Sequence, residues 1–227
     1  MDNKVNYLVY IKLNYNNFDK LLKRLQIFEK HCIPSLLNQT NQNFKVLINV
    51  NLDEKFYNLV KKYDKYENFY LSDLSINDFC KKIWDNYSNK ILITTRLDSD
   101  DSLNINYIDS IYKLLKNKKI IYLININKNI IINFSMGIQL NTDNLSIRKR
   151  IYKIPNPFLT LISINGNHCR NYQHQIIHKF YYFINLNNNT PMWIQTIHSE
   201  NILNNFIHGI KIGKCNSEIN KHFKIKI

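Results

Sequence analysis

Three carboxylates lie within four residues in the first half of the chain. The segment Thr94–Asp101 has the sequence TTRLDSDD, in which Asp98, Asp100 and Asp101 are the acids. Crowded carboxylates repel one another, and a bound cation removes that repulsion. Mg²⁺ and Mn²⁺ prefer oxygen ligands and leave positions for phosphate oxygens. The segment therefore predicts a divalent metal that bridges a nucleoside diphosphate and stabilises it as it departs.

A local structural role is the alternative for these acids. Asp100, Asp101 and Ser102 could cap a helix that begins near Asn104, because acids and serine accept hydrogen bonds from the free N–H groups of a first helical turn. A single Asp-x-Asp pair is common by chance. The elements around the pair must decide between the two interpretations.

The first hundred residues alternate between strand and helix patterns. Such alternation predicts an α/β fold with a mostly parallel central sheet flanked by helices. Ligands bind beyond the carboxyl ends of strands in such sheets. The acids follow the fourth predicted strand directly, which favours a binding site. The predicted strands are Val5–Leu13, Phe44–Leu52, Phe69–Leu71 and Ile91–Thr95, and the predicted helices begin at Phe18, Asp53 and Ile76.

The pattern is weaker beyond residue 103. Ile105–Leu115 predicts a helix, Lys119–Ile126 and Asn129–Leu140 predict two strands, and Asn141–Arg150 predicts a loop. No linker rich in Gly, Ser or Pro divides the chain. We expect one domain over residues 1–227, with a nucleotide-sugar-binding half (1–103) and an acceptor-facing half (104–227).

The chain carries a net charge of +14, from 31 Lys and Arg against 17 Asp and Glu. Most of these cations are Lys residues scattered among Asn and Ile, a composition typical of A/T-rich genes. No zinc-finger, basic-zipper or RNA-recognition signature accompanies them, so we expect no dedicated nucleic-acid binding. The positive field would instead attract anions such as nucleotide-sugars.

Neither an apolar run of about 20 residues nor a signal peptide is visible in the sequence. The four cysteines form no CxxC pair, which fits reduced thiols. We therefore expect a cytoplasmic protein, of a bacterium or of a virus-infected host cell. Its basic surface could make peripheral contact with a membrane that carries lipid-linked acceptors.

The string TTRLDSDD resembles the signature of the putative rhamnosyltransferase family, a group of GT-A glycosyltransferases with a TTRLD-x-DD core. Other blocks resemble the family in the same order, and together they extend from about residue 10 to residue 203. These blocks are HCIPSLLNQTNQNF at residues 31–44, NPFLTL at residues 156–161 and PMWIQTIH at residues 191–198, followed by Asn201.

The resemblance implies a GT-A fold and a metal-dependent enzyme. Such an enzyme would transfer a sugar, with rhamnose expected, from a uridine or thymidine diphosphate carrier to a glycan acceptor. It implies Mn²⁺ or Mg²⁺ held by Asp98 and Asp100, with Asp100 as the direct ligand and Asp98 at the donor ribose or at metal-bound water. Asp101 would share that work or cap a helix. His198 falls where the fold returns a late ligand, so we predict its ring within one coordination sphere, or one water, of the ion. A structural imidazole is the alternative.

Further residues are candidates for binding donor and acceptor. Lys12 and Asn14 occupy the place of an Arg-Phe-Asn segment of the family, Asp53 would contact the base, and Arg96 would reach the ribose or diphosphate. The structural alternatives are a solvated Lys12, an N-cap at Asp53, and an Arg96 that pairs with the neighbouring acids. Trp193 would stack on an acceptor sugar or belong to the core.

An inverting transferase needs a base that takes the proton of the acceptor hydroxyl. Glu200 is the first candidate, His174 the second and Asp143 the third, and a retaining mechanism stays open. Rival interpretations are a transferase of another hexose and a carbohydrate-binding module without activity. The presence of Asp98, Asp100 and His198 argues against loss of the metal site.

Overall fold

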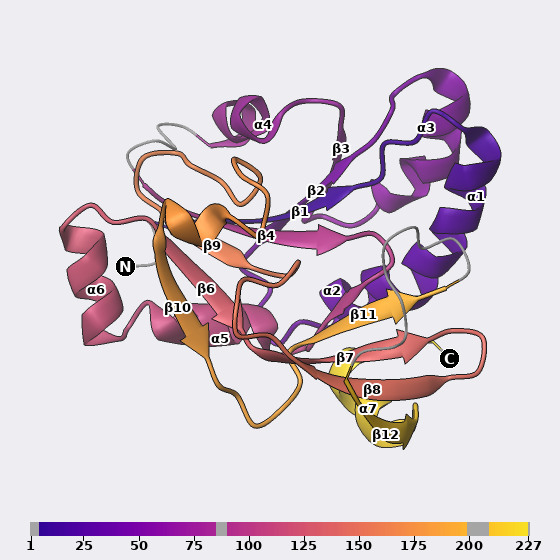
Figure 1. The fold of residues 1–227 in the computed structure, drawn as a ribbon. Helices are drawn as coiled ribbons and strands as arrows, with labels where there is room; N and C mark the ends of the chain where they lie inside the picture. The colour runs from indigo at the N-terminus through magenta and orange to yellow at the C-terminus, as the bar shows by residue number, and fades with distance from the viewer. Residues whose placement is uncertain (1–4, 85–89, 199–208, 227) are drawn as a thin grey trace.

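A seven-stranded sheet forms the centre of this computed structural model, which describes residues 5–84, 90–198 and 209–226 (Figure 1). Every strand runs parallel to its neighbours except β9, which is antiparallel to both of its partners. The strands lie in the order β10 (Tyr182–Leu186), β6 (Ile130–Phe134), β9 (Thr160–Ser163), β4 (Ile91–Asp98), β1 (Val5–Lys12), β2 (Lys45–Asn49) and β3 (Phe69–Ser72).

Both faces of this sheet are buried, as the successive buried residues of β1 show. Val9 and Ile11 belong to a core that includes Leu25 of helix α1 (Phe18–Ile27). Leu8 points to the opposite face and packs in a second core with Phe79 of helix α4 (Ile76–Ile83). A strand covered on both faces needs apolar residues at successive positions, which is the pattern of β1 and β4.

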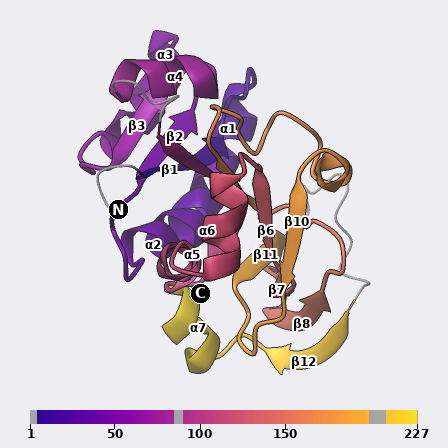
Figure 2. The same cartoon turned by 90° about the vertical axis from the view of Figure 1, so that its left-hand side faces the viewer.

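A second sheet of five strands lies below the first (Figure 1). Its outer face packs on helix α7 (Ser217–Phe223) through Ile138, Ile194 and Phe223. In two views at right angles, α3 and α4 lie at one end of the molecule and α7 and β12 at the other (Figures 1 and 2). The strands lie in the order β12 (Ile210–Lys214), β8 (Ser146–Ile151), β7 (Met136–Asn141), β11 (Trp193–Ile197) and β5 (Ser102–Leu103).

The predicted alternation of the first hundred residues is confirmed. Helix α1 continues through a π-helical turn, Phe28–Cys32, into helix α2 (Ile33–Leu37), and Pro34 lies in the first turn of α2. The other helices are α3 (Glu54–Val60), α5 (Tyr107–Leu114) and α6 (Lys118–Asn125), with 3₁₀ turns at Lys61–Tyr63 and Ile177–Lys179.

Three predictions beyond residue 103 are wrong. The single strand predicted at 129–140 is divided into β6 of the central sheet and β7 of the second sheet. The segment predicted as a strand at 119–126 is helix α6, in which Ile120 and Leu123 are buried at helical spacing and Asn117 caps the first turn. The segment predicted as a loop at 141–150 contains β8, which pairs with β7 across a short turn. The apolar run of α6 suits a helix or a strand, so the two are hard to distinguish in it. The strand β8 is mostly polar and charged, so little apolar alternation marks it.

The central sheet takes strands from both predicted halves of the chain, since β6, β9 and β10 come after residue 103. The chain passes from the central sheet into the second sheet through the turn that carries the acids, because β5 follows that turn and pairs with β11. Within the described ranges, no helix has the length and apolar character that a membrane span requires.

Candidate functional site

The acid turn, Asp98–Asp101, lies at the carboxyl end of β4. Lys12, the last residue of β1, is beside Asp98 in the sheet and also pairs with Asn49 of β2. The ends of three parallel strands therefore meet at the acid turn, as expected for a ligand site of an α/β sheet. The Asp98 side chain is 40% exposed, whereas Asp100 and Asp101 are buried.

Asp101 holds the end of β11 against this turn. Its Oδ1 accepts a hydrogen bond of 2.8 Å from the backbone N–H of Thr196. Burial, together with the charges of Asp100 and Asp98, raises the pKa of Asp101 well above its usual value. Helix α5 begins at Tyr107 after an N-cap position at Asn106, so the helix-capping alternative for Asp100, Asp101 and Ser102 is wrong.

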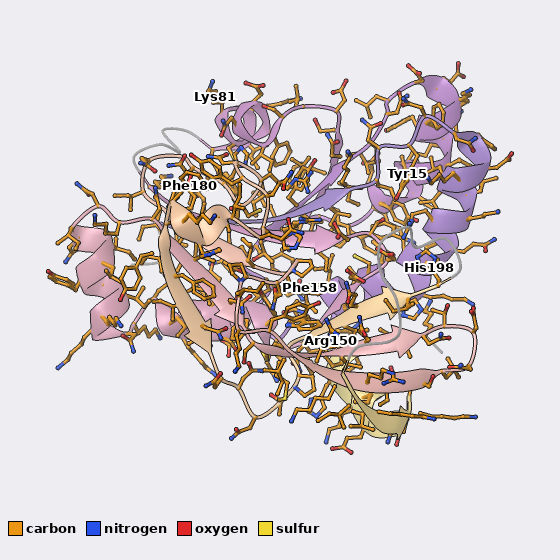
Figure 3. All side chains as sticks on the ribbon, in the orientation of Figure 1. Tyr15, Lys81, Arg150, Phe158, Phe180 and His198 are labelled. Carbon is orange, nitrogen blue, oxygen red and sulfur yellow. The ribbon has the colours of Figure 1, made fainter. Side chains whose placement is uncertain are left out.

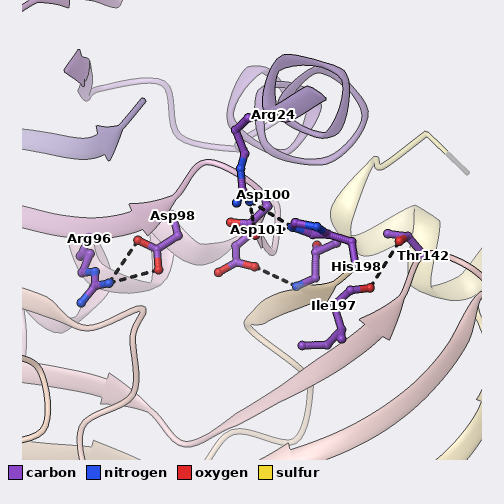
Figure 4. Close-up of polar contacts among 9 residues, drawn as sticks. Arg24, Arg96, Asp98, Asp100, Asp101, Thr142, Ile197 and His198 are labelled. Atoms are coloured by element: carbon purple, nitrogen blue, oxygen red, sulfur yellow. Dashed lines mark hydrogen bonds and ion pairs between the residues drawn. The ribbon is translucent and has the colours of Figure 1, made fainter. Parts of the chain in front are cut away.

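His198 follows β11 and contacts Asp100 (Figure 4). Its Nε2 lies 2.9 Å from Asp100 Oδ2, although the two residues are 98 positions apart, and both side chains are buried. The two side chains thus lie close enough to share an ion, as the prediction for His198 requires, and the ion itself stays a prediction. Figure 3 shows His198 near helix α1, on the side where Tyr15 lies.

Arg24 of helix α1 completes this cluster and is not among the predicted site residues. Its Nη1 lies 2.5 Å from Asp100 Oδ2 and 3.0 Å from His198 Nε2 (Figure 4). Arg24 is buried on the same helix face as Leu21 and Leu25. A charged residue at an apolar position of an amphipathic helix was the signal in the sequence that could have identified it.

The charges around Asp100 keep it ionised. Burial alone would raise its pKa, but the hydrogen bond to His198 and the Arg24 guanidinium hold the pKa below its usual value. His31, in the π-helical turn behind the site, is buried and its Nδ1 has no partner among the described residues. Burial and Lys30 lower the pKa of His31 to about 4, so it is neutral at pH 7.

Arg96 pairs with Asp98, as the structural alternative for Arg96 proposed. Its Nη2 lies 3.2 and 3.1 Å from the two carboxylate oxygens. Its Nη1 donates to His174 Nδ1 at 3.2 Å. Burial and the Arg96 charge lower the pKa of His174 to about 4. Since the Nδ1 lone pair of His174 already accepts from Arg96, His174 is poorly placed to act as a base.

The predicted donor-binding residues lie at the same edge of the sheet. Lys12 and Asn14 are exposed at the end of β1. Asp53 is exposed before α3, and its side chain makes no capping hydrogen bond. The ends of β1 and β2 lie beside the end of β4, and Lys12 is the register partner of Asp98.

Trp193 belongs to the core, and its predicted contact with an acceptor sugar is wrong. Its ring has no exposed surface and stacks on Phe158 with centroids 4.7 Å apart. Its Nε1 donates to the carbonyl of Phe134 at 2.8 Å. The ring also covers Gly137, where a Cβ atom would lie 2.1 Å from it. No face of the ring is left for a sugar.

Of the two carboxylates predicted as bases, Asp143 and Glu200, the structure describes Asp143. Asp143 is exposed in the turn between β7 and β8, and the neighbouring Thr142 donates its N–H to the carbonyl of Ile197 at 3.0 Å. This contact brings the turn beside the end of β11. Glu200 lies outside the described residues.

A sequence model described as "Putative rhamnosyl transferase" matches residues 11–208. The chain belongs to this family. The match includes Arg24, the acid turn and His198, whereas β12 and α7 lie beyond it. The predicted family is thereby confirmed. No curated protein matches the chain significantly.

Solved structures resemble this family member in fold. The crystal structure of S. aureus TarS 1-349 has 14% identity and a TM-score of 0.51, over 84% of this chain and 60% of that chain. The crystal structure of S. aureus TarS has 13% identity and a TM-score of 0.53, over 85% of this chain and 37% of that chain. This chain thus spans three fifths or less of either. The likeness concerns the fold, and the predicted α/β fold of the GT-A type is confirmed.

The distance between Asp100 and His198 in this member of the rhamnosyl transferase family fits a divalent ion bound by both side chains. Adjacent ligands of an octahedral ion with bonds of about 2.1 Å lie roughly 3 Å apart, close to the 2.9 Å between Asp100 Oδ2 and His198 Nε2. Carboxylate oxygen and imidazole nitrogen suit Mn²⁺. The guanidinium of Arg24 shows that this place accommodates a positive charge. Among the residues that the structure describes, no third His, Cys, Asp or Glu joins the pair, so other ligands would be diphosphate oxygens and water.

Proposed function

We propose that this protein is a metal-dependent glycosyltransferase. It transfers a sugar, with rhamnose expected from the family, from a nucleoside-diphosphate-sugar to a glycan acceptor. The contact between His198 and Asp100 carries this proposal, because it joins a late residue of the chain to the acid turn at the carboxyl edge of the sheet. The match of the family model over both residues supports it.

Each described residue then has a defined task. Asp100 and His198 hold Mn²⁺ or Mg²⁺, which when bound neutralises charge on the departing diphosphate. Asp98 lies more exposed than Asp100 and faces the donor ribose, with Arg96 fixing its orientation through two hydrogen bonds. Asp101 keeps β11, and with it His198, against the acid turn.

The base that takes the acceptor proton is a carboxylate near the end of β11. Asp143 is the described candidate, because its turn is tied to Ile197. Glu200, two residues after His198, stays the first choice of the sequence prediction. An inverting reaction requires this base on the face of the sugar opposite to the departing diphosphate. The cytoplasmic location and the membrane contact stay predictions.

A thermal-shift panel tests the proposed function. Purified protein is heated with UDP, dTDP, GDP or CDP, each with Mn²⁺ and with a chelator. We expect one nucleotide, UDP or dTDP, to raise the melting temperature only in the presence of Mn²⁺, because a ligand that binds the folded state stabilises it.

Two histidine variants make the panel specific. His198→Ala should abolish the metal-dependent shift, whereas His222→Ala, on α7 outside the matched region, should retain it. A panel in which no nucleotide gives a metal-dependent shift with the wild-type protein would contradict the proposed function.

A further inference from the structure

Three atoms in the site make three mutual contacts that cannot all be hydrogen bonds at the same time. Arg24 Nη1, Asp100 Oδ2 and His198 Nε2 form a triangle with separations of 2.5, 2.9 and 3.0 Å. An imidazole nitrogen either donates a proton or accepts one. If Nε2 donates to Asp100, it turns its N–H toward the N–H of Arg24. If it accepts from Arg24, two lone pairs face each other between His198 and Asp100.

A divalent cation between Asp100 and His198 removes this conflict, because both lone pairs then point to the ion. The ion and the guanidinium are both positive and both require Asp100 Oδ2. They repel each other strongly at such a distance in a buried site. Arg24 therefore cannot keep its present contact when the ion is bound.

The displaced guanidinium has an obvious new partner. Arg24 is 8% exposed, and its Nε is buried without a hydrogen-bond partner among the described residues. Its guanidinium lies over the ring of Tyr15, with 5.9 Å between Cζ and the ring centroid. A guanidinium presents Nε and Nη as a fork that matches two phosphate oxygens. A diphosphate on the ion would bring such oxygens beside it.

We propose that Arg24 is the resting counter-ion of Asp100, that a divalent ion displaces it, and that the displaced guanidinium binds the diphosphate of the donor. This inference rests on the proposed function. Arg24 then weakens the binding of the ion alone and strengthens the binding of the ion together with a nucleoside diphosphate. The site is thereby selective for the complex of metal and nucleotide over the free metal.

The test measures two affinities in Arg24→Gln and in wild-type protein. Calorimetric titration with Mn²⁺ alone should show tighter binding to Arg24→Gln, by roughly tenfold, a size typical of coupling between sites. Titration with dTDP or UDP at saturating Mn²⁺ should show weaker binding to the variant, by a similar factor. Lys20→Gln, an equal change of charge on the exposed face of α1, is the matched control and should change neither affinity by more than about twofold.

A second measurement uses wild-type protein, in case Arg24→Gln does not fold. The Nε–Hε signal of Arg24 in NMR spectra, assigned through its absence from Arg24→Lys, should shift on addition of Mg²⁺ and shift again on addition of the nucleoside diphosphate.

The possible outcomes separate the two proposals. Two results would overturn the competition between Arg24 and the ion. One is unchanged or weaker binding of Mn²⁺ alone to Arg24→Gln, and the other is an Nε–Hε signal that does not shift when Mg²⁺ is added. Unchanged nucleotide affinity would overturn the contact with the diphosphate. If wild-type protein binds nucleotide equally well in Mn²⁺ and in chelator, the metal-dependent function itself fails, and this inference fails with it.

Discussion

Asp101 accepts a hydrogen bond from the backbone N–H of Thr196, 95 positions later in the chain. This contact joins the turn after β4 to the strand that ends just before His198. Together with the pairing of β11 with β5 and β7, this bond fastens the end of β11 beside the acids, two residues before His198.

Two replacements of Asp101 should therefore show whether the stability of the protein depends on the hydrogen bond to Thr196 or on the charge of the carboxylate. Asp101→Ala leaves the N–H of Thr196 buried without a partner, and we expect a loss of about 1–3 kcal/mol in the free energy of unfolding. Asp101→Asn keeps an acceptor oxygen in place and should cost much less. Urea unfolding of both variants measures the difference. Equal stability of Asp101→Ala and wild type would show that the bond does not hold β11.

Asp100→Asn should keep the fold but remove donor hydrolysis and sugar transfer. One neutral oxygen then replaces the charged ligand, and Arg24 loses its counter-ion. We expect a loss of activity of at least about a hundredfold, as when a transition-state charge loses its stabilisation. The measurement is release of nucleoside diphosphate by chelator-treated protein after Mn²⁺ is restored. Asp98→Asn is the comparison, with a smaller loss expected, and wild-type turnover by Asp100→Asn would refute the assignment.

His31 should make the protein less stable in mild acid. Its pKa is about 4 in the folded state and about 6.5 in the unfolded chain. As the pH falls from about 6.5 to about 4, the unfolded chain gains a proton that the folded state does not, so the stability due to neutral His31 is lost.

The difference between wild type and His31→Asn isolates this contribution, because other groups titrate in both proteins. Asp101, whose pKa is raised, acts with the opposite sign as the pH falls. The free energy of unfolding of the wild type minus that of His31→Asn, measured by urea unfolding, should decrease as the pH falls from 7 to 4. Parallel curves for the two proteins would contradict the buried, neutral state of His31.

Gly137 should tolerate no side chain. An added Cβ would lie 2.1 Å from the Trp193 ring, which is itself fixed by Phe158 and by its bond to Phe134. Overpacking of a rigid core costs about 1–3 kcal/mol or more, and we expect Gly137→Ala at the upper end. Thermal unfolding tests this, and a melting temperature equal to that of wild type would show that the ring is free to move.

Local patterns could predict much of the fold. The apolar run of β4 followed by crowded acids located the site, because a buried parallel strand must end at the ligand edge of its sheet. Helix α6 was predicted wrongly, since its isoleucines suit both a strand and a buried helix face. The hairpin β7–β8 was missed for a different reason. Four of the six residues of its second strand are charged or polar, so little apolar alternation marks that strand.

The site was predictable only where a motif carried the information. His198 was predicted from a block shared with the family, not from its spacing to Asp100. Arg24 lies 174 positions before His198, and only the packing of α1 over the acid turn brings the two side chains together. Burial of Trp193 depends on Gly137 and Phe158 in other strands and loops, which sequence neighbours do not show.

The central claim is that Asp100 and His198 hold a divalent ion at which the nucleoside diphosphate binds. The most direct measurement is an anomalous difference map from crystals grown with Mn²⁺ and either dTDP or UDP. The account predicts one strong peak about 2.1–2.3 Å from both Asp100 Oδ2 and His198 Nε2, an ordinary ligand distance, with diphosphate oxygens completing the shell. A bound nucleotide with its Mn²⁺ peak ligated by neither side chain would contradict the account.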